Sequence, residues 1–181
     1  MRLFTAIDLP FDVVATLEAL IAKLRPAARI QWSPPGNMHI TTQFIGEWEE
    51  ARLEQLQAAL AAIPPRGPIT VDVSKLGFFP NPRSPRVFWC GIEAPELDAL
   101  AAATETATAA LGIRNETRPF SPHLTLARIK APLDLKPLHE AIARLASLDF
   151  GRFIVQRFFL YQSKLHPSGS VYTKLAEFPF S

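Results

Sequence analysis

The sequence has one cysteine, no long apolar run and no large excess of either charge. Because Cys90 is the only cysteine, no disulfide can form within the chain, which is typical of proteins in a reducing cytoplasm. No stretch approaches the roughly 20 consecutive apolar residues that cross a bilayer, so we expect no association with a membrane. Residues 1–20 are interrupted by Asp8, Pro10 and Asp12, which breaks up the apolar segment that a signal peptide needs. We therefore expect a cytoplasmic protein.

Several catalytic motifs are also missing. There is no CxxC or HExxH pattern, which argues against a zinc site, and no GxSxG pattern, which argues against a serine hydrolase. No glycine-rich phosphate loop suggests ATP hydrolysis. The net charge of +2, from 19 basic and 17 acidic residues, is too balanced for tracking along a duplex. We expect no metal and no cofactor, and any nucleic acid should be contacted locally, at an end.

The remaining composition is that of an ordinary globular protein. The 181 residues are 48% hydrophobic and 20% charged, which suits a single domain spanning 1–181. Most of the 17 prolines lie between periodic segments and indicate stiff loops. Apolar periodicity predicts four helices, at 11–24, 50–62, 95–111 and 135–147. It also predicts seven strands, at 2–8, 38–46, 69–79, 86–93, 122–129, 152–162 and 171–178.

The order of these elements repeats. An offset of 84 residues separates Arg2 from Arg86 and also His39 from His123, which indicates an internal duplication. Each unit must bury one face of its sheet under its helices. We therefore expect an α+β protein of two pseudo-symmetric lobes, about 1–84 and 85–181, between which some elements can be exchanged. Two antiparallel sheets should carry their helices outside and enclose a central cleft.

The repeated histidines are the candidate catalytic residues. Side chains alternate along a strand, so His39 shares a face with Thr41, and His123 shares a face with Thr125. One neutral and one protonated imidazole supply a general base and a general acid together. The threonine hydroxyls can donate hydrogen bonds to phosphate oxygens. This set predicts metal-free hydrolysis of a strained phosphodiester such as a ribose 2′,3′-cyclic phosphate.

The motifs resemble a known family. Residues 39–42 (HITT) and 123–126 (HLTL) are similar to the paired HxTx motifs of the 2H phosphoesterase superfamily. Their flanks, 35–38 (PGNM) and 118–122 (RPFSP), resemble those of the RNA 2′,3′-cyclic phosphodiesterases, which are also called 2′-5′ RNA ligases. The C-terminal segment 161–175 fits the same pattern, so the resemblance covers nearly the whole chain.

The resemblance implies a reaction and roles for the site residues. Similar proteins hydrolyse an RNA 2′,3′-cyclic phosphate to a 2′-phosphomonoester, and some join or split 2′-5′ linkages without ATP. By this analogy His39 is the proton donor to the leaving 3′ oxygen, and His123 is the proton acceptor that activates water. Thr41 and Thr125 bind the phosphate, and Arg128 adds positive charge.

The roles of the other candidate positions are open. Strict alternation from His123 points Arg128 away from the cleft, so its role requires a bulge or a strand end. Lys164 and Tyr172 are candidate substrate contacts or parts of a solvated turn. Thr42 stands where the family has an apolar residue, and it either adds a hydroxyl to the site or loosens the packing. Phe44 could stack on a base or belong to the core.

Two alternatives to the RNA phosphodiesterase stay open. One is a related enzyme that acts on a small cyclic nucleotide or a 2′-5′ oligonucleotide. The other is a binding module for nucleotides or RNA ends that keeps the fold without turnover. The expected partner is RNA with a 2′,3′-cyclic phosphate end or a nucleotide, and the expected state is a monomer.

Overall fold

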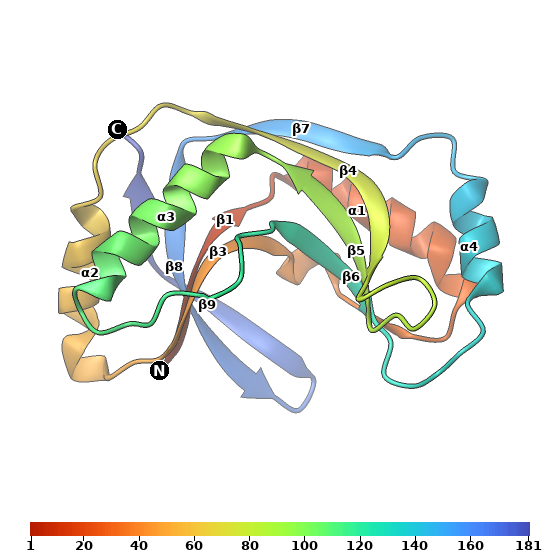
Figure 1. The fold of residues 1–181 in the computed structure, drawn as a ribbon, viewed down its shortest axis with the longest axis horizontal. Coiled ribbons are helices and arrows are strands. Elements are labelled where there is room, and N and C mark those ends of the chain that lie inside the picture. The colour runs from red at the N-terminus through yellow and green to blue at the C-terminus, as the bar shows by residue number, and fades with distance from the viewer.

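The computed structural model describes residues 1–181 and contains two antiparallel sheets (Figure 1). The four-stranded sheet has the order β3-β1-β8-β9, with β1 at Arg2–Asp8, β3 at His39–Glu47, β8 at Arg157–His166 and β9 at Gly169–Pro179. The five-stranded sheet has the order β2-β6-β5-β4-β7, with β2 at Gln31–Trp32, β4 at Ile69–Phe79, β5 at Val87–Glu93, β6 at His123–Arg128 and β7 at Asp149–Val155. The predicted α+β class with two antiparallel sheets is confirmed.

Four α-helices lie outside the sheets, as predicted: α1 at Phe11–Leu24, α2 at Leu53–Ala61, α3 at Pro95–Ala109 and α4 at Lys136–Ala143. Helices α2 and α3 lie beside the four-stranded sheet, whereas α1 and α4 lie beside the five-stranded sheet (Figure 1). Short 3-10 turns cover Arg25–Ala27, Pro35–Asn37 and Glu50–Arg52. Helix α1 buries one apolar face, formed by Val13, Leu17, Leu20, Ile21 and Leu24. None of the helices combines the length and the apolar character that a membrane crossing requires.

Each sheet takes strands from both halves of the chain. Strands β1 and β3 come from the first half, and β1 also pairs with β8 from the second half. Strands β5 and β6 come from the second half, and β5 also pairs with β4 from the first half. Each sheet therefore contains two strands from the other half, β8 and β9 in the four-stranded sheet and β2 and β4 in the five-stranded sheet, which ties the two sheets into one unit.

The structure differs from the predicted elements in three places. The segment predicted as one strand at 152–162 forms two, because β7 pairs with β4 and β8 pairs with β1. Only Gln156 lies between them, so the chain changes sheets without a turn signal. Strand β2 was not predicted, because two residues are too short to show a period. Helix α4 ends at Ala143, four residues before the predicted end at 147.

Candidate active site

The two predicted histidines occupy matching positions on neighbouring strands. His39 is the first residue of β3 and His123 is the first residue of β6. Strands β3 and β6 approach each other although they belong to different sheets. The residues that follow, Ile40 and Leu124, are buried, whereas both histidines and both threonines two residues further on are half-buried. The expected alternation therefore holds over the first three residues of each motif.

The backbone fixes the same tautomer in both imidazoles. The Nδ1 atom of His39 lies 3.0 Å from the carbonyl oxygen of Asn37, and the Nδ1 atom of His123 lies 2.8 Å from that of Ser121. A carbonyl oxygen only accepts hydrogen bonds, so Nδ1 carries the proton in both rings. In the neutral form each Nε2 atom is then left with a lone pair for a proton. The backbone therefore leaves Nε2 of each histidine available to give or take a proton.

A β-bulge falls at the last residue of each motif. The pairing of β3 with β1 skips Thr42, and the pairing of β6 with β5 skips Leu126. At each bulge two consecutive side chains are buried: Thr42 and Gln43 on β3, and Leu126 and Ala127 on β6. The extra residue shifts the alternation by one. Phe44 and Arg128, each five residues after its histidine and both exposed, are thereby returned to the histidine face.

Aromatic rings surround His39. Its imidazole stacks on Phe4 with ring centroids 4.6 Å apart, and Tyr172 meets it edge-on at 5.0 Å. Tyr161 stacks on the same Phe4 ring at 5.4 Å. Burial among these rings lowers the pKa of His39, while its hydrogen bond to the Asn37 carbonyl and the nearby charge of Asp8 act in the opposite direction.

A polar network beside His39 was missed by sequence reasoning. Asp8 lies opposite His39 in the β1–β3 pair and accepts a hydrogen bond from the Tyr161 hydroxyl. The other carboxylate oxygen of Asp8 lies 2.7 Å from Nζ of Lys174, which sits 3.7 Å above the Phe159 ring. Burial and the bond to Asp8 raise the pKa of Tyr161. The available signal was an acidic residue at the end of a strand whose interior is mostly apolar.

The surroundings of His123 are more open. A cavity of about 360 Å³ lies beside it, lined partly by Phe79 and Trp89. The Phe79 ring meets the His123 imidazole edge-on at 5.3 Å. The strand partner of His123 is Gly91, which has no side chain to fill this space. The two motifs therefore share their backbone geometry but not their environment.

The other predicted contacts divide between the two faces. Tyr172 reaches His39, as described. Thr42 lies on the buried face, where its hydroxyl is 2.7 Å from that of Thr5. Lys164 is exposed, and alternation along β8 places it on the face opposite Tyr161. The structure therefore brings neither Thr42 nor Lys164 to the histidines.

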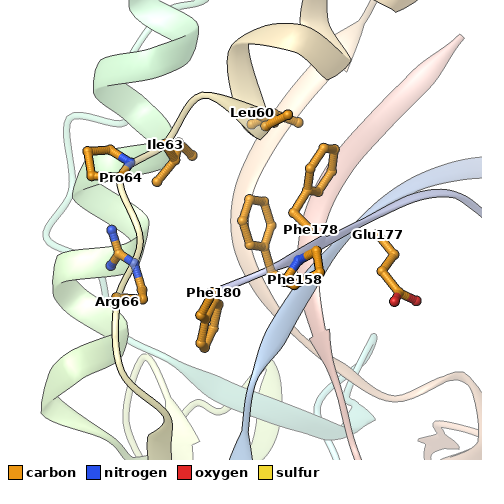
Figure 2. Close-up of a pocket in the computed structure, with 10 residues that line it drawn as sticks. Leu60, Ile63, Pro64, Arg66, Phe158, Glu177, Phe178 and Phe180 are labelled. Atoms are coloured by element: carbon orange, nitrogen blue, oxygen red, sulfur yellow. The ribbon is translucent and has the colours of Figure 1, made fainter.

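A smaller cavity of about 130 Å³ lies at the C-terminal end of the chain, over Phe158, Phe178 and Phe180 (Figure 2). Arg66 and Glu177 border it, and none of the residues of the two motifs lines it. No group of three or more His, Cys, Asp or Glu side chains is arranged to hold a metal ion. The chemistry described above therefore centres on β3 and β6.

The two imidazoles are held alike on strands of different sheets that approach each other, and each has a threonine on its face. Such groups are suited to acid–base chemistry on a phosphate-like anion. Comparison with known proteins identifies the family. The family model described as LigT-like phosphoesterase matches residues 7–89 and 92–172. The chain therefore belongs to the LigT-like phosphoesterases, which confirms the family that its motifs resemble.

Individual relatives match along nearly the whole chain. An RNA 2′,3′-cyclic phosphodiesterase of Archaeoglobus fulgidus is 32% identical over 179 residues, which cover 98% of this chain and 99% of that protein. The protein of the same name from Thermus thermophilus is 35% identical, with 98% and 89% covered. A crystal structure of a T. thermophilus protein has a TM-score of 0.82 at 34% identity, covering 99% and 98%. The structure of Escherichia coli LigT complexed with 3′-AMP has a TM-score of 0.80 at 27% identity, covering 98% and 97%.

Proposed function

We propose that this enzyme hydrolyses RNA 2′,3′-cyclic phosphate ends to 2′-phosphomonoesters by a two-histidine acid–base mechanism. The observation that carries the proposal is the matched pair of Nε2 atoms at the starts of β3 and β6, each set free by an Nδ1 bond to the backbone. The names of the relatives from A. fulgidus and T. thermophilus support the substrate, and the complex of E. coli LigT with 3′-AMP supports a nucleotide-sized ligand.

The proposed reaction needs one proton removed and one delivered. Nε2 of His123 accepts a proton from water, whose oxygen attacks phosphorus. The bond between phosphorus and O3′ breaks, and Nε2 of His39 donates a proton to O3′. The product is a 2′-phosphate with a free 3′ hydroxyl. Exchange of protons with solvent then restores both histidines.

The remaining residues bind the anion. The hydroxyls of Thr41 and Thr125 donate hydrogen bonds to the non-bridging oxygens, and Arg128 adds a charge-assisted bond from the face to which its bulge returns it. Tyr172 is the proposed substrate contact on the His39 side. We omit Thr42 and Lys164, because the first is buried against Thr5 and the second faces away.

The same arrangement supports attack on phosphorus by a second nucleophile. When a 5′ hydroxyl replaces water as nucleophile, the product is a 2′-5′ phosphodiester, and no ATP is consumed. The partner that follows from this proposal is an RNA end in the cytoplasm. The net charge of +2 fits a contact limited to that end.

The test is turnover of an RNA oligomer ending in a 2′,3′-cyclic phosphate, with EDTA present. His39→Ala and His123→Ala should each reduce the rate at least ~10²-fold, the usual contribution of a general acid or base. His139→Ala is the matched control, because this exposed histidine lies on α4 and packs on Phe78. Wild-type turnover that requires metal would contradict the mechanism. Turnover of small cyclic nucleotides or 2′-5′ oligonucleotides without turnover of RNA ends would show that these, and not RNA ends, are the substrate.

A further inference from the structure

The cavity beside His123 is larger than the space that one attacking water molecule needs. Its volume of about 360 Å³ lies within the range of small-molecule sites, roughly 300–1,000 Å³. The corresponding space beside His39 is filled by Phe4, Tyr161 and Tyr172. The two motifs have the same backbone geometry, but only His123 has an open space beside it. This difference indicates a role for the space.

The cavity is built by unusual backbone positions. Gly91, opposite His123, cannot carry a side chain, because a Cβ there would lie 2.5 Å from the carbonyl oxygen of Ser74. Lys75 sits in a bulge of β4 with φ of 69°, a conformation uncommon outside glycine. A bulge of this kind redirects a side chain, and strained positions of this kind gather at functional sites.

The lining combines flat apolar surfaces with a polar rim. The rings of Phe79 and Trp89 lie 5.3 Å apart, and Phe79 is 39% exposed. The indole nitrogen of Trp89 is a buried donor without a partner, an exception that is unusual in folded proteins. Lys75 and Glu93 are exposed lining residues that offer a cation for phosphate and a carboxylate for hydroxyl or N–H groups. Flat rings with a polar rim are suited to a nucleoside.

We infer that this cavity binds the nucleoside that carries the attacking 5′ hydroxyl in 2′-5′ ligation, an inference that rests on the proposed function. The general base must contact the nucleophile, so a nucleoside whose hydroxyl replaces water lies on the His123 side. Its base stacks on Phe79, and Lys75 binds the phosphate on its 3′ side.

The step is balanced without a further reactant. The O5′–phosphorus bond forms while the phosphorus–O3′ bond breaks. The proton of the 5′ hydroxyl passes to Nε2 of His123, and O3′ receives a proton from Nε2 of His39. With the cavity empty, water takes the place of the hydroxyl and hydrolysis results. Occupancy of the cavity therefore decides between ligation and hydrolysis.

The experiment mixes an RNA oligomer ending in a 2′,3′-cyclic phosphate with a 5′-hydroxyl oligonucleotide and measures ligated and hydrolysed products together. Phe79→Ala should lower the ratio of ligation to hydrolysis about tenfold, the effect of losing one base–aromatic stack. Glu93→Gln should raise the KM for the acceptor and leave hydrolysis unchanged. Phe11→Ala is the control, because Phe11 is 90% exposed on α1 and outside the cavity. The pH profile of hydrolysis checks that His123 is undisturbed.

The outcomes separate this inference from the proposed function. Wild type that hydrolyses the cyclic phosphate but forms no 2′-5′ product overturns the acceptor site and leaves the hydrolase intact. An equal loss of both products in Phe79→Ala and Glu93→Gln also overturns it, because these side chains would then act through His123. If the wild-type protein turns over no cyclic phosphate at all, both the proposed function and this inference are wrong.

Discussion

Asp8 on β1 lies directly opposite His39 on β3, with its carboxylate held by the Tyr161 hydroxyl and the Lys174 ammonium. The partner of His123 at the equivalent place is Gly91. One histidine therefore has a carboxylate beside it and the other does not. A negative charge favours the protonated imidazole, and burial opposes it. For His39 burial is the larger effect and its pKa is lowered, so Asp8 only offsets part of that lowering. The role of His39 as the proton donor therefore rests on the family analogy.

Replacing Asp8 with Asn should shift the pH dependence of turnover. Removal of the charge leaves burial to lower the pKa of His39 further. A general acid acts only while protonated, so the alkaline limb of the rate profile should move to lower pH. The profile of kcat/KM against pH measures this shift. Asp12→Asn, in the first turn of α1, is the control. An acidic limb that moves instead would make His39 the base.

Arg128 should contribute to phosphate binding because of the bulge at Leu126. Arg128→Ala should reduce kcat/KM about 10- to 100-fold, which corresponds to the loss of one hydrogen bond to a charged group. Arg128→Lys should recover part of this, since it keeps the charge but not the fork of donors. Arg144→Ala serves as a control on the exposed surface of the molecule. Kinetics of Arg128→Ala equal to wild type would place its side chain away from the phosphate.

The sequence predicted the strands and the histidine–threonine faces because alternation is regular over their first residues. It could not predict the bulges. Two consecutive buried residues end the alternation on each strand, and the polar pair Thr42 and Gln43 does not read as buried. Their burial depends on partners far along the chain: Thr42 bonds to Thr5, and the Gln43 amide donates to Thr108 on α3 at 2.9 Å. Such partners are visible only in the fold.

The cavity and the network at Asp8 escaped prediction for a related reason. Both depend on which strand neighbours which, and the exchange of β4 and β8 between the sheets sets that order. Ser74 and Lys75 reach the His123 side because β4 pairs with β5. Tyr161 reaches His39 because β8 pairs with β1. A repeat offset in the sequence gives equivalent positions but not their neighbours.

Cys90 should be unreactive in the folded protein. Its side chain is fully buried on β5, and burial raises the pKa of the thiol to about 12. Thiolate is the reactive form, so neither exposure nor ionisation favours modification. An aromatic disulfide reagent should label about one thiol per chain in denaturant and almost none in native buffer. Fast labelling of the native protein would mean that β5 opens locally, which hydrogen exchange on β5 amides would detect.

Gly77 should be required for the position of Trp89, the inner wall of the cavity beside His123. A Cβ at Gly77 would lie 2.1 Å from Cζ2 of Trp89, so Gly77→Ala forces the indole to move. Such overpacking costs about 1–3 kcal/mol, measurable by urea unfolding. Because Trp89 lines the cavity, a displaced indole should change the shape of the cavity and lower the ratio of ligation to hydrolysis as well.

Two further variants test whether the collision with the Trp89 indole causes the loss of stability in Gly77→Ala. A Cβ at Gly67 would meet nothing within 4 Å, so Gly67→Ala should change stability by no more than about 0.5 kcal/mol. Adding Trp89→Phe to Gly77→Ala removes the indole atoms that collide and should restore part of the lost stability. The two substitutions should therefore be non-additive in a double-mutant cycle, as expected for residues in contact. Strict additivity would show that the cost of Gly77→Ala arises in the backbone of β4 and not at the indole.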